Sequence, residues 1–186
     1  YKRQVFASDF SSAFKEAIAY GWELPKANRI DWDFFSKKLN AEVSRLEGIY
    51  RNLLKNSGVQ TFDQHAKVVD AHTIELASGK QITSEYILLA TGGKPDLPDI
   101  PGIDNVITSD QVFSLSALPE KLLVVGGGYI ACEFSSIFNG FGSSVTQFCR
   151  SDTILRGFDT EATSLVATQM KSCLLYTSPS PRDLDL

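Results

Sequence analysis

The sequence is poor in cysteine, and its three cysteines, Cys132, Cys149 and Cys173, are far apart along the chain. Redox dithiols and most zinc sites place cysteines only a few residues from one another. We therefore expect no redox-active cysteine pair and no metal site in this chain. Cys132 and Cys149 are interpreted as two structural thiols in a reducing compartment.

Long apolar runs and a basic charge excess are also missing. No stretch approaches the about 20 apolar residues that a transmembrane helix needs, and no signal peptide is visible. The net charge of −4 disfavours binding to nucleic acid or to an anionic membrane. With 43% hydrophobic and 22% charged residues the composition is globular, and we expect a cytoplasmic location.

Both ends of the chain differ in character from the rest. Residues 173–186 interrupt a helical pattern with a Pro-Ser run that a helix cannot continue. This segment resembles a translated sequencing adapter, and residues 1–4 resemble the other end of the same adapter. We predict an adapter-like scar at 1–4 and a disordered adapter-like tail at 173–186, and exclude both from the fold.

Two amphipathic helices are predicted in the first third of the chain. The first has an apolar face made by Phe10, Phe14 and Ile18, and it ends at Gly21. The second runs from Asp31 to about Asn56. Its apolar residues recur at spacings of three and four, which indicates a stripe for packing on a neighbouring element: Leu39, Val43, Leu46, Tyr50 and Leu53.

Short strands follow these helices. Residues 67–70 and 72–76 are predicted strands, with a hairpin turn at Ser78-Gly79. The apolar run 86–90 predicts a buried strand, followed by Thr91-Gly92-Gly93. Glycines at the carboxyl end of a strand let the backbone pass close to a ligand, although an ordinary crossover into the proline-containing linker is the alternative.

A glycine-rich turn carries the strongest chemical signal. An apolar run leads into residues 126–131, Gly-Gly-Gly-Tyr-Ile-Ala, which fit G-x-G-x-x-A. Gly126 allows the tight turn, Gly128 the close approach of a pyrophosphate, and Ala131 the packing of helix on strand. The helix N-terminus offers N–H groups and partial positive charge to the anion. A second strand at 145–148 completes a predicted dinucleotide-binding β-α-β unit.

The end of that second strand indicates which dinucleotide binds. NAD sites usually place Asp or Glu about 20 residues past the first glycines, where this chain has Cys149 and Arg150. A carboxylate would repel a 2′-phosphate, whereas a guanidinium binds phosphate through two parallel hydrogen bonds. Arg150 and Arg156 therefore favour NADPH. The alternative is that both arginines are solvated loop charges.

These motifs belong to a longer pattern that also includes Ser44–Asn52, Ile87–Pro95, Asp99–Gly102 and Leu155–Asp159. With it the chain resembles an internal fragment of the glutathione reductase branch of the pyridine nucleotide-disulphide oxidoreductases. The resemblance implies an α/β fold with parts of two Rossmann-like (FAD/NAD(P)-binding, three-layer) domains, the second nested in the first and both incomplete. Residues 5–93 would be the C-terminal part of the first FAD-binding segment, and 94–172 the first half of the NADPH-binding domain.

The resemblance also assigns site residues. Tyr129 would gate the nicotinamide pocket, Glu133 would lie near the nicotinamide, and Tyr50 would lie between the halves of glutathione disulphide. The NADPH set is Gly126, Gly127, Gly128, Tyr129, Ile130, Ala131, Glu133, Arg150 and Arg156, and the FAD set is His65, Ala66, Thr91 and Gly92. From the residues alone, Tyr50 could instead be a core aromatic, His65 a loop histidine and Glu133 a solvated acid.

The activity that the resemblance implies is glutathione-disulphide reduction by a homodimer, which maintains reduced glutathione and cell redox homeostasis. A hydride would pass from NADPH to FAD, and electrons would pass through a C-x-x-x-x-C disulphide to glutathione disulphide. The cysteine pair, first FAD glycine motif and interface domain are missing, so we expect the fragment itself to be inactive. Leu53 stands where the family has an asparagine, so the substrate contacts are less well defined than the cofactor contacts. The alternatives are an NADH-using lipoamide dehydrogenase-like flavoenzyme and a non-catalytic NADPH-binding module.

Overall fold

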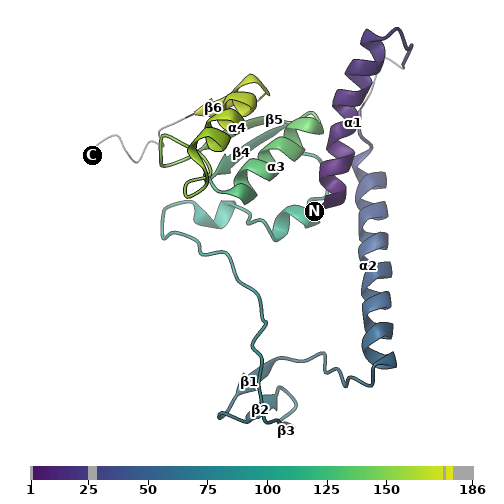
Figure 1. Ribbon diagram of the computed structural model, residues 1–186, viewed down its shortest axis with the longest axis vertical. Helices are drawn as coiled ribbons and strands as arrows, with labels where there is room; N and C mark the ends of the chain where they lie inside the picture. The colour runs from purple at the N-terminus through teal and green to yellow at the C-terminus, as the bar shows by residue number, and fades with distance from the viewer. Residues whose placement is uncertain (1, 25–28, 174, 178–186) are drawn as a thin grey trace. The chain divides into compact units, whose positions relative to one another are not determined.

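The computed structural model describes residues 2–24, 29–173 and 175–177, and the chain divides into two compact units (Figure 1). One unit comprises residues 1–39 and 109–186, and the other comprises residues 40–108. Residues 1–39 belong to the first unit because the first helix and the start of the second pack on the β-α-β unit. The domain boundary predicted after residue 93 stays a prediction. Each unit is described by itself.

The first unit is built on a parallel sheet in the order β4-β5-β6. Helix α3 connects β4 to β5, and α4 connects β5 to β6 (Figure 1). The bounds are Lys121–Val125 for β4, Tyr129–Gly140 for α3, Ser144–Phe148 for β5, Thr160–Cys173 for α4 and Leu175–Thr177 for β6. The predicted β-α-β unit is confirmed, and a short helix, η2, covers Gln111–Ser114 before it.

Strand β6 lies in the tail that the sequence predicted to be disordered. Residues 175–177 pair in parallel with residues 146–148 of β5, so the prediction does not hold for them. The edge of β5 presents N–H and C=O groups that an extended segment with β-favouring residues can pair with. Residues 178–186 lie outside the described part of the chain. At the other end, Lys2–Gln4 form the first turn of α1, and their adapter-like origin stays a prediction.

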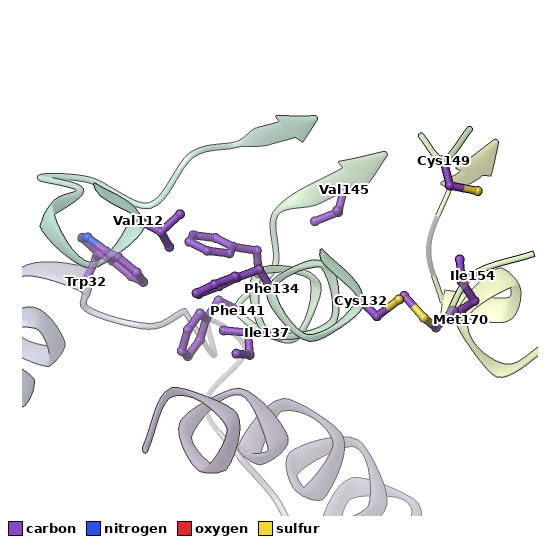
Figure 2. Packing of buried hydrophobic residues seen from close by; sticks show 11 residues of the cluster. Trp32, Val112, Cys132, Phe134, Ile137, Phe141, Val145, Cys149, Ile154 and Met170 are labelled. Atoms are coloured by element: carbon purple, nitrogen blue, oxygen red, sulfur yellow. The ribbon is translucent and has the colours of Figure 1, made fainter. Parts of the chain in front are cut away.

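The core of the first unit is rich in aromatic residues. The Trp32 ring lies 6.0 Å from that of Phe138 and 5.7 Å from that of Phe141, and its Nε1 donates to the Leu115 carbonyl at 2.9 Å. Figure 2 shows Trp32, Phe134 and Phe141 on one side of α3 and Cys132 with Met170 on the other. Such aromatic pairs stabilise a fold by about 0.5–1.5 kcal/mol beyond their burial. The core therefore holds α3 firmly behind the glycine turn.

Helix α1, Lys2–Ala19, packs on α3 through small and polar residues. Its buried residues are Gln4 and Ser8, and a Cβ at Gly140 of α3 would lie only 2.7 Å from the Ser8 Cβ. The predicted apolar face of Phe10 and its neighbours is instead exposed. Close approach of the two backbones decides which face of α1 is covered.

The second unit contains most of α2, Trp32–Asn56, whose span agrees with the sequence prediction. An antiparallel sheet follows in the order β1-β2-β3. Its strands are Ala66–Val68, Thr73–Leu76 and Gln81–Thr83, and a short helix, η1, covers Ile103–Asn105. The predicted hairpin turn is confirmed by the hydrogen bond from Gly79 N–H to Leu76 O at 2.8 Å. The apolar stripe of α2 within this unit is exposed.

The buried strand predicted at 86–90 does not form. Tyr86 is 81% exposed, Leu88 89% and Leu89 68%, and this segment has no strand partner among the described residues. A buried parallel strand needs neighbours on both sides and helices on both faces. The sheet of this unit supplies neither, so the prediction is wrong here. Among the described helices, none is long and apolar enough to cross a membrane.

Candidate dinucleotide-binding site

Three consecutive glycines join β4 to α3, and each has different surroundings. Gly126 has φ +141°, and a Cβ on it would lie 3.4 Å from the Ala131 Cβ. A Cβ on Gly127 would lie 3.0 Å from the Cys149 Cβ, whereas one on Gly128 would meet nothing within 4 Å. The first two glycines therefore permit packing within the protein. The third faces open space, on the side where a pyrophosphate would lie.

The three carbonyl groups of this turn all accept hydrogen bonds from the protein. The donors come from three different elements, namely a side chain of β5, the loop after β5, and α3. The bonds are Gln147 Nε2 to Gly126 O at 2.8 Å, Leu155 N–H to Gly127 O at 2.6 Å, and Cys132 N–H to Gly128 O at 3.1 Å. In a trans peptide the N–H points away from the C=O. The amides that follow each carbonyl therefore point away from these donors.

Helix α3 begins directly after the turn. Gly128 is its N-cap residue and makes no side-chain cap hydrogen bond. The first N–H groups of a helix have no partner within the helix, and the N-terminus has partial positive charge. An anion placed there would be bound by both effects. Tyr129 and Ile130 are exposed beside this end, and Ala131 is half-buried against the turn.

Arg150 and Arg156 lie at the two ends of a loop that is bonded to the same turn. Ile154 of this loop is fully buried, and its Cα would lie 3.7 Å from a Cβ on Gly127. The neighbouring Leu155 has φ +55° and donates its N–H to the Gly127 carbonyl. The loop is therefore held against the glycine turn, and it has one of the two arginines at each end.

Both guanidinium groups are exposed. Within the part of the chain that the structure describes, neither Arg150 nor Arg156 makes an ion pair or a side-chain hydrogen bond. This exposure fits the alternative of solvated loop charges as well as phosphate recognition, so the assignment of Arg150 and Arg156 stays a prediction. They remain able to bind a phosphate from outside the protein.

Tyr129 and Glu133 line one groove of the first unit. The groove lies among α1, α3 and α4 and has a volume of about 950 Å³. Lys15 and Asp9 of α1 contribute to its other wall. The structure thus brings together the two residues that the resemblance assigns to the nicotinamide end, and that assignment stays a prediction.

Sequence reasoning missed Gln147, Ile154 and Leu155. Gln147 is fully buried in β5, between the inward-facing Val145 and Cys149. An amide at a position where the alternation predicts an apolar side chain is a signal that could have drawn attention to it. The roles of Ile154 and Leu155 depend on how the loop folds back, which no local pattern shows.

Cys132 and Cys149 are buried, and neither forms a disulfide among the described residues. Burial raises the pKa of the Cys132 thiol, so this group stays protonated at neutral pH. Cys149 packs under Gly127, and its Sγ donates to the Ser151 carbonyl at 2.9 Å. The structural interpretation of both thiols fits these surroundings. Within the described residues, no cluster of His, Cys, Asp and Glu could hold a metal ion.

The residues assigned to FAD lie in the second unit and are not gathered there. His65 precedes β1 and Ala66 begins it, while Thr91 and Gly92 lie in a segment without helix or strand. All four are exposed, and none of the hydrogen bonds found among the described residues joins one pair to the other. This unit alone therefore forms no flavin pocket from them, and the FAD assignment stays a prediction.

Tyr50, the assigned substrate residue, lies on the exposed stripe of α2 and is 65% exposed. It lines a shallow groove of about 520 Å³ with Leu46 and Leu54. The adjacent Arg51 donates to Asp63 at 2.7 Å and to Glu47 at 2.9 Å, which ties the helix to the loop before β1. Tyr50 is not a core aromatic of the described residues, and its contact with substrate stays a prediction.

Comparisons with known proteins agree with this geometry. A model of the family described as pyridine nucleotide-disulphide oxidoreductase matches residues 7–173. The chain is 46% identical over 158 residues to the chloroplastic/mitochondrial glutathione reductase of Pisum sativum, covering 85% of this chain and 28% of that protein. Glutathione reductase of Burkholderia cepacia is 36% identical over 170 residues, covering 91% of this chain and 37% of that protein.

The chain is also similar to disulphide reductases that are not named glutathione reductase. Thioredoxin reductase 2, mitochondrial, of Drosophila melanogaster is 37% identical over 171 residues, covering 88% of this chain and 33% of that protein. The flavoprotein disulfide reductase RclA from Escherichia coli, solved as a Cu(II) complex, matches with a TM-score of 0.70 and 27% identity. That match covers 80% of this chain and 35% of the solved one. The chain thus spans about a third of the length of these proteins, and the α/β fold expected from the sequence is confirmed.

Proposed function

Because the chain belongs to the pyridine nucleotide-disulphide oxidoreductase family, we propose that it is the central part of an NADPH-dependent glutathione-disulphide reductase. We call that longer protein the parent enzyme. Membership of the family implies FAD and a pyridine nucleotide as cofactors. One observation carries the choice of NADPH: Arg150 and Arg156 flank a loop that is hydrogen-bonded to the pyrophosphate turn, and neither meets a carboxylate among the described residues.

The residues of the chain hold and orient the nucleotide. The amides of the glycine turn and of the first turn of α3 bind the pyrophosphate, where Gly128 leaves open space. Arg150 and Arg156 bind the 2′-phosphate through charge-assisted hydrogen bonds. Tyr129 covers the nicotinamide end, and Glu133 lies near it in the same groove. When bound, the nucleotide supplies a hydride and the flavin relays its electrons to a disulphide.

The disulphide substrate is glutathione disulphide, and the parent enzyme is a homodimer that maintains reduced glutathione in the cytoplasm. Support for this substrate comes from the relatives named glutathione reductase, which are 36% to 46% identical to the chain. Tyr50, exposed on α2, contacts the substrate between its two halves. The redox cysteine pair belongs to the parent enzyme, so the 186-residue chain does not turn over by itself.

The proposal is tested by steady-state kinetics of the parent enzyme with NADPH and NADH, each with glutathione disulphide or an oxidised thioredoxin. The expected result is a preference for NADPH and reduction of glutathione disulphide. A preference for NADH would instead support a lipoamide dehydrogenase-like enzyme. Reduction of thioredoxin alone would support the activity named for the Drosophila relative. Tight NADP+ binding by the chain and no turnover by any longer form would support a non-catalytic module.

A further inference from the structure

We propose that Gln147 is a positioning residue that presets the glycine turn for the pyrophosphate. Its side chain is fully buried, and its Nε2 donates to the Gly126 carbonyl at 2.8 Å. The other two carbonyls of the turn are bonded by backbone N–H groups. Gln147 is therefore the side chain on which the orientation of the first carbonyl depends.

Gly126 needs such a restraint because it lacks a side chain and lies at φ +141°. Its N–H donates to Phe148 O at 2.8 Å, so β5 holds this residue from both its N–H and its C=O. The peptide that joins Gly126 to Gly127 is planar, which fixes the Gly127 N–H opposite the bonded carbonyl. With Gln147 in place, this amide is directed away from β5 before any ligand arrives.

Loss of the amide would release that peptide and leave a carbonyl without its partner. A glycine peptide has many accessible orientations, and the ligand would then have to select one of them. Dinucleotide affinity would fall for this reason, although no atom of Gln147 touches the ligand. The effect concerns the pyrophosphate, which NADPH and NADH share, and it is separate from recognition of the 2′-phosphate by Arg150 and Arg156.

The inference rests on the proposed function only in that the parent enzyme binds a dinucleotide. Gln147→Leu in the parent enzyme removes the donor, and Gln147→Met provides a second apolar variant of closer shape. Dissociation constants for NADP+ and for NAD+ are measured by calorimetry, with KM and kcat from the reductase assay. We expect both dissociation constants to rise by the same factor of about three to ten, the worth of one hydrogen bond. The KM for the nucleotide rises with kcat nearly unchanged.

Thr163→Val is the matched control. Thr163 of α4 is buried, and its Oγ1 donates to the Thr160 carbonyl at 3.0 Å, so this variant also loses one side chain to backbone hydrogen bond. Thermal unfolding reports the loss of stability in each variant. Unchanged nucleotide affinity in both Gln147 variants, or a change no larger than in Thr163→Val, would overturn the inference. A wild-type preference for NAD+ would refute the NADPH proposal. The inference on Gln147 would still stand if Gln147→Leu raised the dissociation constants for NADP+ and NAD+ by the same factor.

Discussion

Both units of the molecule form regular helices and strands, but they differ in how far the apolar side chains of their helices are buried. In the first unit, α3 lies between an aromatic cluster and a parallel sheet, and Ile137 and Phe138 are almost completely buried. In the second unit, α2 has full helical structure while its apolar stripe remains exposed. Periodicity is enough to predict a helix, but burial requires partners from elsewhere in the chain. The first unit has those partners both in the neighbouring strands of the β-α-β unit and in α1 and Trp32 from a distant part of the chain.

Removal of a large core side chain is the strongest test of this contrast. We expect Phe138→Ala to lower the free energy of unfolding of the chain by about 3–5 kcal/mol, because a cavity replaces a buried ring. Leu53→Ala on the stripe of α2 should cost less than about 1 kcal/mol, since Leu53 is 55% exposed. Denaturant titration of both variants measures the difference. Similar losses in the two variants would show that the stripe of α2 is covered.

The loop from Arg150 to Arg156 supplies the next test, which concerns nucleotide binding by the first unit. Arg150→Gln or Arg156→Gln in the parent enzyme should weaken NADPH binding by about ten- to a hundredfold, since each removes a charged hydrogen bond to phosphate. Binding of NADH should stay the same, because it lacks the 2′-phosphate. Arg45→Gln is the control, as Arg45 lies on α2 and its ion pair among the described residues is with Glu42. Equal losses for both nucleotides would contradict 2′-phosphate recognition.

A pair of glycine variants separates packing from ligand contact within the turn. Gly127→Ala should cost about 1–3 kcal/mol of stability, because its Cβ would approach that of Cys149, at 3.0 Å. Gly128→Ala should leave stability nearly unchanged, since its Cβ meets nothing within 4 Å, and should weaken nucleotide binding about tenfold. Thermal unfolding and calorimetry distinguish the two. Normal nucleotide affinity in Gly128→Ala would place the pyrophosphate elsewhere.

The smallest expected effect is in the second unit and depends on pH. The hydrogen bond and charge of Arg51 hold the pKa of Asp63 below its ordinary value of 3.8. A lowered folded-state pKa stabilises the protein above pH 3.8, and this contribution is lost as the pH falls through the folded-state value. The unfolding midpoints of wild type and Arg51→Gln should therefore differ at neutral pH, and only slightly because both side chains are exposed. The two midpoints should converge in acid, where Asp63 is protonated. If the difference in unfolding midpoint persisted in acid, a contact of Arg51 other than the one with Asp63 would be its cause.

The sequence predicted those features whose cause is local. The span of α2 follows from its apolar spacing, the hairpin from Ser78-Gly79, and the β4-α3-β5 unit from the run of glycines between an apolar strand and an apolar helix. The glycine turn is where the structure also builds the candidate site. The strand at 86–90 and the packed face of α1 were predicted wrongly because both depend on what lies beside them.

By itself, the sequence determined the family and the glycine turn, and it predicted the roles of the two arginines, because these depend on residue type and spacing along one short stretch. Only the tertiary structure decided that Gln147 and Leu155 bond the carbonyls of the turn. It also decided that Ser8 rather than Phe10 meets α3, where Gly140 admits a close backbone approach. Hydrogen bonds and contacts between segments distant in sequence have no local pattern, since they arise only when the chain folds back on itself.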